Sequence, residues 1–212
     1  MQDDLFAGTE HSKTATWSEQ IDLVDGDVSL FHHWLSPAEA EQLMVSLTSE
    51  LRWEQSTISM YGQAVKIPRL NAWYGDPNAR YQYSGALFDP LPWTDSLKEL
   101  KRRVEIELGE QFNSVLANLY RNGSDSVSWH SDNEPELGRN PVIASLSLGQ
   151  SRHFLLKHRK DRDLGTIKLM LSAGDLLLMK GATQHHWLHS VPKVSKTIGP
   201  RINLTFRRVT DL

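Results

Sequence analysis

The sequence RINLTFR, residues 201–207, alternates polar and apolar side chains along its whole length. Residues two apart on a β-strand point to the same side. One face of this strand therefore carries two arginines, an amide and a hydroxyl, and the other is apolar: Arg201, Asn203, Thr205 and Arg207 against Ile202, Leu204 and Phe206. Such a polar face is ordinary if it meets solvent, but inside a barrel its two guanidinium groups would need anions.

The residues after Gln111 predict a run of short strands that ends in this one. β-branched and apolar side chains recur in short stretches separated by Gly, Asn, Pro and Asp, which is typical of strands and turns. The stretches before residue 201 are SVLANLY, SVSWHSD, VIASLSLG, RHFLLKH, GTIKLMLS, GDLLLMK and HHWLHSV. This pattern predicts an antiparallel, double-sheet architecture.

Two helices and a hairpin are predicted upstream. The first helix begins after Ser36, an N-cap followed by Pro37 and, three residues after the cap, Glu39. The second lies within residues 94–112, where leucines recur at helical spacing. The stretch 56–75 reads as a hairpin with its tip near residues 61–63. The expected fold is mostly β with flanking helices, around a double-stranded β-helix (jelly-roll) core.

Composition limits the class of protein. The chain has 212 residues, no cysteine and a formal net charge of −3. We expect residues 1–18 to be a polar arm and residues 19–212 to form a single domain. The absence of cysteine excludes disulfides and thiolate metal sites. With no apolar run long enough to span a membrane and no secretion signal, a cytoplasmic protein is expected, or a nuclear one in a eukaryote.

The stretch SVSWHSD places His130 and Asp132 two residues apart, and therefore on one strand face. An imidazole and a carboxylate are two of the three ligands of the facial triad that holds non-heme Fe(II). With 9 histidines and 26 carboxylates in the chain, about one such pair is expected by chance. A surface hydrogen bond between the two residues would explain the pair equally well.

A third ligand has to come from a distant segment, and TQHHWLHSVP, residues 183–192, offers it. Read as a strand, it places His185 and His189 on one face and His186 on the other. A zinc-protease motif would need Glu where His186 stands, so that class is discounted. Strand geometry does not choose between His185 and His189.

The polar face of residues 201–207 also suggests a cosubstrate. A small dicarboxylate would satisfy two inward-facing guanidinium groups. The alternation of ANLY, residues 117–120, gives Asn118 and Tyr120 a common face, which adds an amide and a phenol.

In this order, NLYRNGSDSVSWHSD, SLSLGQSRHFLLKH, GDLLLMKGATQHHWLHSVP and PRINLTFR resemble the AlkB family of Fe(II)/2-oxoglutarate dioxygenases. The likeness is greatest to the duplex-acting animal homologues and their bacterial relatives, and it extends upstream through YGQAVKIPRLNAWYGD and YQYSG. It implies oxidative demethylation of N-alkylated nucleobases such as 1-methyladenine and 3-methylcytosine, with release of formaldehyde, succinate and CO2. The expected partner is alkylated DNA, single- or double-stranded, with RNA as a further substrate.

The resemblance also implies roles for individual residues. The metal ligands would be His130, Asp132 and His189. Arg201 and Tyr120 would hold the distal carboxylate of 2-oxoglutarate. The remaining cosubstrate contacts would lie near its metal-chelating end: Asn118, Asn203, Arg207 and, as a weaker correspondence, Thr205.

Substrate contacts are implied in the same way. Tyr83, with Tyr81 nearby, would stack on the flipped base, and Tyr61 would fill the gap that the base leaves. Asn133 and Glu134 follow the metal strand, and Glu134 would face a cationic methylated base. Plain structural roles for the tyrosines remain open.

Phosphate contacts are favoured at Lys193 and Lys196, with Arg69, Arg102 and Arg103 as further candidates. Solvated surface positions would explain these basic side chains as well. A hydroxylase of a protein or small molecule is the alternative function, and a monomer is expected.

Overall fold

The computed structural model describes residues 17–60, 62–83 and 86–210. The helices are α1 (Pro37–Glu50), α2 (Asp95–Leu108) and α3 (Thr183–His186), with a 3₁₀ turn at Pro135–Leu137. The first seven strands are β1 (Trp17–Ile21), β2 (Asp27–His32), β3 (Thr57–Met60), β4 (Gln63–Lys66), β5 (Leu70–Gly75), β6 (Tyr81–Tyr83) and β7 (Ala86–Phe88). The others are β8 (Ser114–Tyr120), β9 (Val127–His130), β10 (Ile143–Gly149), β11 (Arg152–His158), β12 (Thr166–Leu171), β13 (Leu176–Lys180), β14 (Trp187–Val191) and β15 (Arg201–Arg207).

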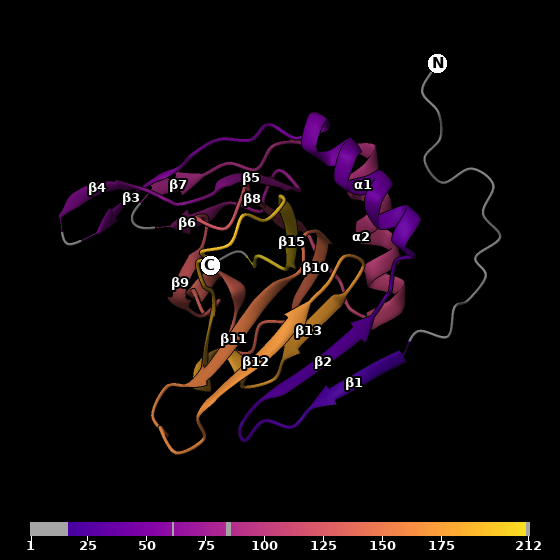
Figure 1. The fold of residues 1–212 in the computed structure, drawn as a ribbon. Coiled ribbons are helices and arrows are strands. Elements are labelled where there is room, and N and C mark those ends of the chain that lie inside the picture. The colour runs from indigo at the N-terminus through magenta and orange to yellow at the C-terminus, as the bar shows by residue number, and fades with distance from the viewer. Residues whose placement is uncertain (1–16, 61, 84–85, 211–212) are drawn as a thin grey trace.

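Two antiparallel sheets form the centre of the molecule (Figure 1). The larger has the order β1-β2-β13-β10-β15-β8-β5, and the smaller has the order β12-β11-β14-β9. Two separate hairpins, β3–β4 and β6–β7, lie beside them. Except for the consecutive pairs β1–β2 and β11–β12, neighbouring strands in these sheets are distant in the sequence, as in a jelly roll. The predicted fold class, mostly β with a jelly-roll core, is confirmed.

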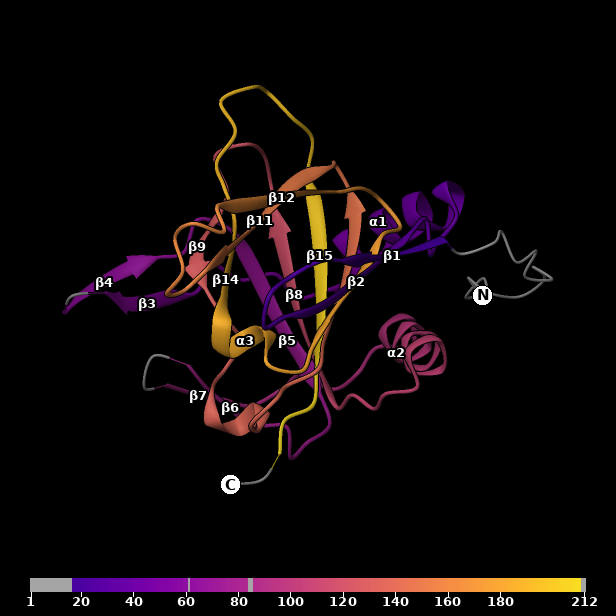
Figure 2. The ribbon, with the colours of Figure 1, turned by 90° about the horizontal axis from the view of Figure 1, so that it is seen from below.

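Strand β15 lies between β10 and β8 and has the two faces that its alternation predicts. Its apolar side chains join those of α1 and α2 in one core cluster, together with residues of β8 and β10. The two helices lie side by side against this sheet, away from the smaller sheet (Figure 2). The polar face of β15 is therefore turned toward the space between the sheets.

Helix α1 begins as its sequence predicts. The Glu39 amide donates to Ser36 Oγ at 3.3 Å, and the Ser36 amide donates to Glu39 Oε2 at 2.9 Å, so both bonds of a capping box are present. Helix α2 ends at Gly109, whose φ of 67° suits glycine. Arg102 pairs with Glu99 and Arg103 pairs with Glu39. Arg102 therefore pairs within α2, whereas Arg103 connects α2 to α1.

Strands β1 and β2 precede helix α1, although α1 was the first element that the sequence predicted. Strands β1 and β2 form a hairpin on the edge of the larger sheet, and β1 begins at Trp17. Four of the five β1 residues are exposed, so β1 has no apolar alternation for sequence reasoning to detect. No helix within the described residues is long and apolar enough to cross a membrane.

The packing of α1 predicts a large stability difference between two of its residues. Leu47 is fully buried, whereas Val45 is 68% exposed. Leu47→Ala should lower the free energy of unfolding by about 2–5 kcal/mol because it leaves a cavity in the core. Val45→Ala should change it by less than about 0.5 kcal/mol. Urea unfolding measures both, and equal losses would contradict this packing.

Candidate metal and cosubstrate site

His130 and His189 are direct cross-strand neighbours on β9 and β14. Their ring centroids are 4.2 Å apart. Nδ1 of His130 lies 2.8 Å from the carbonyl oxygen of Ser128. A carbonyl only accepts hydrogen bonds, so in the neutral ring Nδ1 carries the proton and Nε2 keeps its lone pair. His130 is therefore held in the tautomer that a metal ligand needs.

Asp132 lies two residues beyond His130, after the end of β9. Its amide donates to the side-chain oxygen of Gln184 at 2.9 Å, and its Oδ1 accepts from Nη2 of Arg207 at 2.8 Å. Gln184 is fully buried on α3. One ligand atom from each of His130, Asp132 and His189 lies within 4.8 Å of the others. Two nitrogens and one carboxylate oxygen, brought together in this way, suit Fe(II).

The expected strand around His185 is wrong. His185 and His186 belong to α3, and β14 begins only at Trp187. The Thr183 hydroxyl donates to the Lys180 carbonyl at 2.6 Å and closes this turn locally, which the apolar pattern of the sequence does not reveal. His185 is exposed and contacts the Arg139 carbonyl, so of the two candidates only His189 faces His130 and Asp132.

The charges around the group favour ligation. Burial raises the pKa of Asp132, but the positive charge of Arg207, with smaller effects of His189 and His130, outweighs it and lowers the value to about 2. Burial, followed by the neighbouring His130, lowers the pKa of His189 to about 3. At neutral pH the carboxylate is therefore ionised and the His189 ring is neutral, which are the forms that bind a metal.

A cavity beside the three residues extends toward Arg201. Arg201 is 2% exposed, and burial lowers the pKa of its guanidinium. Its Nη2 donates to Ser147 Oγ at 2.9 Å, while Nε and Nη1 have no hydrogen-bond partner in the described part of the chain. A buried cation with two unused donors fits an anionic ligand. Tyr120 packs on the guanidinium, with 5.3 Å from its ring centroid to Cζ.

The other predicted cosubstrate residues also line this cavity. Asn203 donates to Ser145 Oγ at 2.7 Å and accepts from the Thr205 hydroxyl at 3.0 Å. Asn118 accepts from Nε of Arg69 at 2.8 Å. Arg69 was considered for phosphate contact, but its side chain lies in the wall of the site. The residues in this wall from the predicted set are Asn118, Tyr120, Arg201, Asn203, Thr205 and Arg207.

A second, larger pocket adjoins the first and shares His130 and Asp132 with it. Its wall includes Trp73, Trp129 and Glu134. Oε2 of Glu134 is buried without a hydrogen-bond partner among the described residues. The sequence did not identify Trp73 and Trp129 as pocket residues, because a tryptophan on a strand is usually interpreted as a core or a surface residue.

The remaining predicted substrate residues lie elsewhere or cannot be placed. Asn133 is exposed, and its side-chain oxygen accepts from the Ser131 hydroxyl at 3.0 Å. Asn133 is not among the residues that line the larger pocket. Tyr61 lies outside the described residues, and so do the side chains of Tyr81 and Tyr83 on β6. Lys193 and Lys196 are exposed in the loop between β14 and β15.

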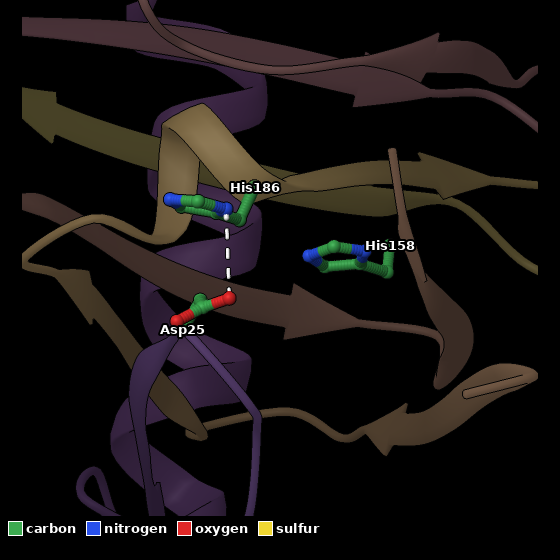
Figure 3. A group of neighbouring side chains, drawn as sticks. All are labelled: Asp25, His158 and His186. Carbon is green, nitrogen blue, oxygen red and sulfur yellow. Dashed lines mark ion pairs between the residues drawn. The ribbon is translucent and has the colours of Figure 1, made fainter. Parts of the chain in front are cut away.

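A second His/Asp group, Asp25, His158 and His186, is shown in Figure 3. Nδ1 of His158 accepts the Asp161 amide at 2.8 Å, which leaves the proton of the neutral ring on Nε2. Nε2 is the atom that points toward the other two residues (Figure 3), and a metal needs a lone pair there. Asp25 is also exposed. The buried group around His130 is therefore the better metal candidate.

Comparison with known proteins agrees with this geometry. Residues 27–207 match the family model of the 2OG-Fe(II) oxygenase superfamily. The human alpha-ketoglutarate-dependent dioxygenase alkB homolog 3 is 42% identical over 190 residues, which cover 86% of this chain and 66% of that protein. The bovine homolog 3 is 41% identical, covering 94% and 70%. Human DNA oxidative demethylase ALKBH2 is 35% identical, covering 81% and 69%.

The fold is also found in a solved structure. The structure of OsALKBH1 superposes with a TM-score of 0.62 at 18% identity, covering 90% of this chain and all of that one. The chain belongs to the 2OG-Fe(II) oxygenase superfamily and, within it, to the AlkB family. Fe(II) and 2-oxoglutarate are therefore its cofactors. The chain spans about two thirds of the length of these curated relatives.

The depressed pKa of His189 predicts how the metal-free protein responds to acid. Its pKa falls from 6.5 to about 3 on folding, so between these values the unfolded chain binds a proton that the folded chain does not. His189 should therefore lower stability by about 1.4 kcal/mol per pH unit as the pH falls through this window. Urea unfolding in the presence of a chelator should show a shallower pH slope for His189→Asn. The exposed control His153→Asn should keep the wild-type slope, and equal slopes in all three proteins would contradict the assignment.

Proposed function

We propose that this protein oxidatively demethylates N-alkylated nucleobases in nucleic acid, of the 1-methyladenine and 3-methylcytosine type, and so reverses alkylation damage directly. The observation that carries the proposal is the junction of two pockets at His130 and Asp132. One pocket ends at a buried guanidinium, and the other has aromatic walls and an unpaired carboxylate oxygen. A dicarboxylate and a flat cationic base fit these two surroundings.

In this proposal His130, Asp132 and His189 hold Fe(II). When bound, the metal activates dioxygen at its open positions while 2-oxoglutarate supplies two electrons and is converted to succinate and CO2. Arg207 keeps the Asp132 carboxylate ionised and oriented through their 2.8 Å bond. Gln184 fixes the backbone of the same residue.

The cosubstrate would lie along the polar face of β15. Nε and Nη1 of Arg201, both buried, would donate to its distal carboxylate, and Tyr120 would hold the guanidinium in place. The residues nearer the metal would surround its chelating end: Asn118, Asn203, Thr205 and Arg207.

The base would enter the larger pocket, with Glu134 opposite its positive charge. Oxidation of the N-methyl carbon gives a hydroxymethyl group that leaves as formaldehyde, and the base recovers its ordinary form. Names of the relatives support nucleic acid as the substrate, since one of them is called a DNA oxidative demethylase. We also propose stacking on the base by Tyr81 and Tyr83, a gap-filling role for Tyr61, and one catalytic domain over residues 19–212.

The role of Arg201 gives a direct test. Arg201→Gln should raise the KM for 2-oxoglutarate about 10- to 150-fold, because hydrogen bonds to a charged group are worth about 1.5–3 kcal/mol. Arg208→Gln removes an exposed arginine just beyond β15 and is the matched control. Steady-state succinate formation measures both. A KM for Arg201→Gln equal to that of the control would contradict the assignment.

The activity itself is tested with iron-loaded protein, 2-oxoglutarate and an oligonucleotide that contains 1-methyladenine, as single-stranded DNA, duplex DNA and RNA. We expect formaldehyde and unmethylated adenine in equal amounts with succinate, and no product from His130→Ala. Succinate coupled to hydroxylation of a protein or small molecule, with the methylated base left intact, would favour the alternative function. Tight binding of the oligonucleotide without any product would exclude both activities.

A further inference from the structure

Trp129 and Lys157 form a rim between the larger pocket and the outer face of the smaller sheet. Trp129 lies on β9, next to His130, and its side chain is part of the pocket wall although 37% of the residue is exposed. Nζ of Lys157, on β11, lies 4.3 Å from the centroid of its ring. An exposed tryptophan beside a metal-ligand candidate has no packing explanation, since it belongs to neither core cluster.

The sheet face beyond this rim is open and basic. Both long helices pack on the other sheet (Figure 2). Lys168 on β12 lies opposite Leu155 of β11 in the strand register, and its side chain is exposed. Met170, on the same strand, is 47% exposed. The outward positions along β11 and β12 thus combine ammonium groups with apolar area, which suits a polyanion that also carries flat groups.

We propose that this rim binds the nucleotide next to the flipped base, with its base stacked on Trp129 and its phosphate at the ammonium group of Lys157. The inference rests on the proposed function, because it needs a nucleobase in the adjoining pocket. The nucleic-acid strand that carries the flipped base into the larger pocket also has to leave this pocket. Trp129 and Lys157 lie at the edge of the pocket, on the side of the open sheet face. Aromatic side chains that stack on bases and cations that follow the phosphate backbone are the two contacts by which proteins hold a nucleic-acid strand without reading its sequence.

The alternative is that the two residues merely stabilise the sheet. An exposed cation–π pair contributes about 0.5–1 kcal/mol to stability. In that case, replacing either residue would lower the unfolding midpoint slightly and leave nucleic-acid affinity alone. Affinity and its salt dependence therefore separate the two roles.

The experiment compares binding of 1-methyladenosine monophosphate with binding of two single-stranded oligonucleotides of the same sequence, one with 1-methyladenine and one with adenine at its centre. The protein is full length, loaded with Mn(II) and 2-oxoglutarate, and binding is followed by calorimetry. The wild type should bind the methylated oligonucleotide more tightly than the monophosphate. In Trp129→Ala the ratio of the affinity for the methylated oligonucleotide to the affinity for the monophosphate should fall about 5- to 150-fold, as the loss of one stacked base predicts. Trp129→Phe should restore most of it.

Lys157→Gln should reduce the slope of log affinity against log salt by about 0.7, the value for one phosphate contact on a single strand, and Lys157→Arg should restore it. The matched controls are Trp17→Ala, a 60% exposed tryptophan on β1, and Lys98→Gln on α2. If Trp129→Ala and Lys157→Gln keep the wild-type affinity and salt dependence, while the wild type still prefers the methylated oligonucleotide, the proposed role of the rim is wrong and the proposed function stands. Absence of any preference for the methylated base in the wild type would overturn the proposed function, and the rim with it.

Discussion

The buried ion pair between Arg207 and Asp132 connects the two sheets at the candidate site. The side chains of both residues are 5% exposed, and the charged atoms lie 2.8 Å apart. A buried carboxylate without a cation would take up a proton and lose its value as a metal ligand. Arg207 prevents this, and it does so from the last residue of β15. The position of that strand in the larger sheet therefore determines whether Asp132, just beyond the end of β9, keeps the negative charge that a metal ligand needs.

Strand β15 has this influence because its two faces perform different tasks. The apolar face packs against the helical layer and makes the strand one of the most buried in the molecule. The polar face then has to satisfy two buried arginines. Asp132 pairs with Arg207, but Arg201 keeps two nitrogens without partners among the described residues. In our proposal a dicarboxylate cosubstrate would supply the missing anion, so that folding and cosubstrate binding depend on the same strand.

Much of the fold could be predicted from the sequence, because strand alternation and helix caps depend on residues that are close together in the chain. The strands after Gln111, the capping box at Ser36 and the two faces of β15 follow from residue order alone. The turn at α3 was missed because Thr183 stabilises it through hydrogen bonds, one of which it accepts from the amide of Asp27 in the distant β1–β2 hairpin. The role of Gln184 was missed for the same reason: its partner is 52 residues away in the sequence. Strand β1 was missed because most of its side chains face solvent.

The central claim is that His130, Asp132 and His189 share one metal ion while Arg201 binds the far carboxylate of 2-oxoglutarate. The most direct measurement is an anaerobic crystal structure of the protein with Fe(II) and 2-oxoglutarate, using anomalous scattering at the iron edge. The account predicts a single iron peak bonded to these three side chains, with the free cosubstrate carboxylate against Arg201. An iron peak at Asp25, His158 and His186 instead, or a cosubstrate carboxylate that does not contact Arg201, would contradict it.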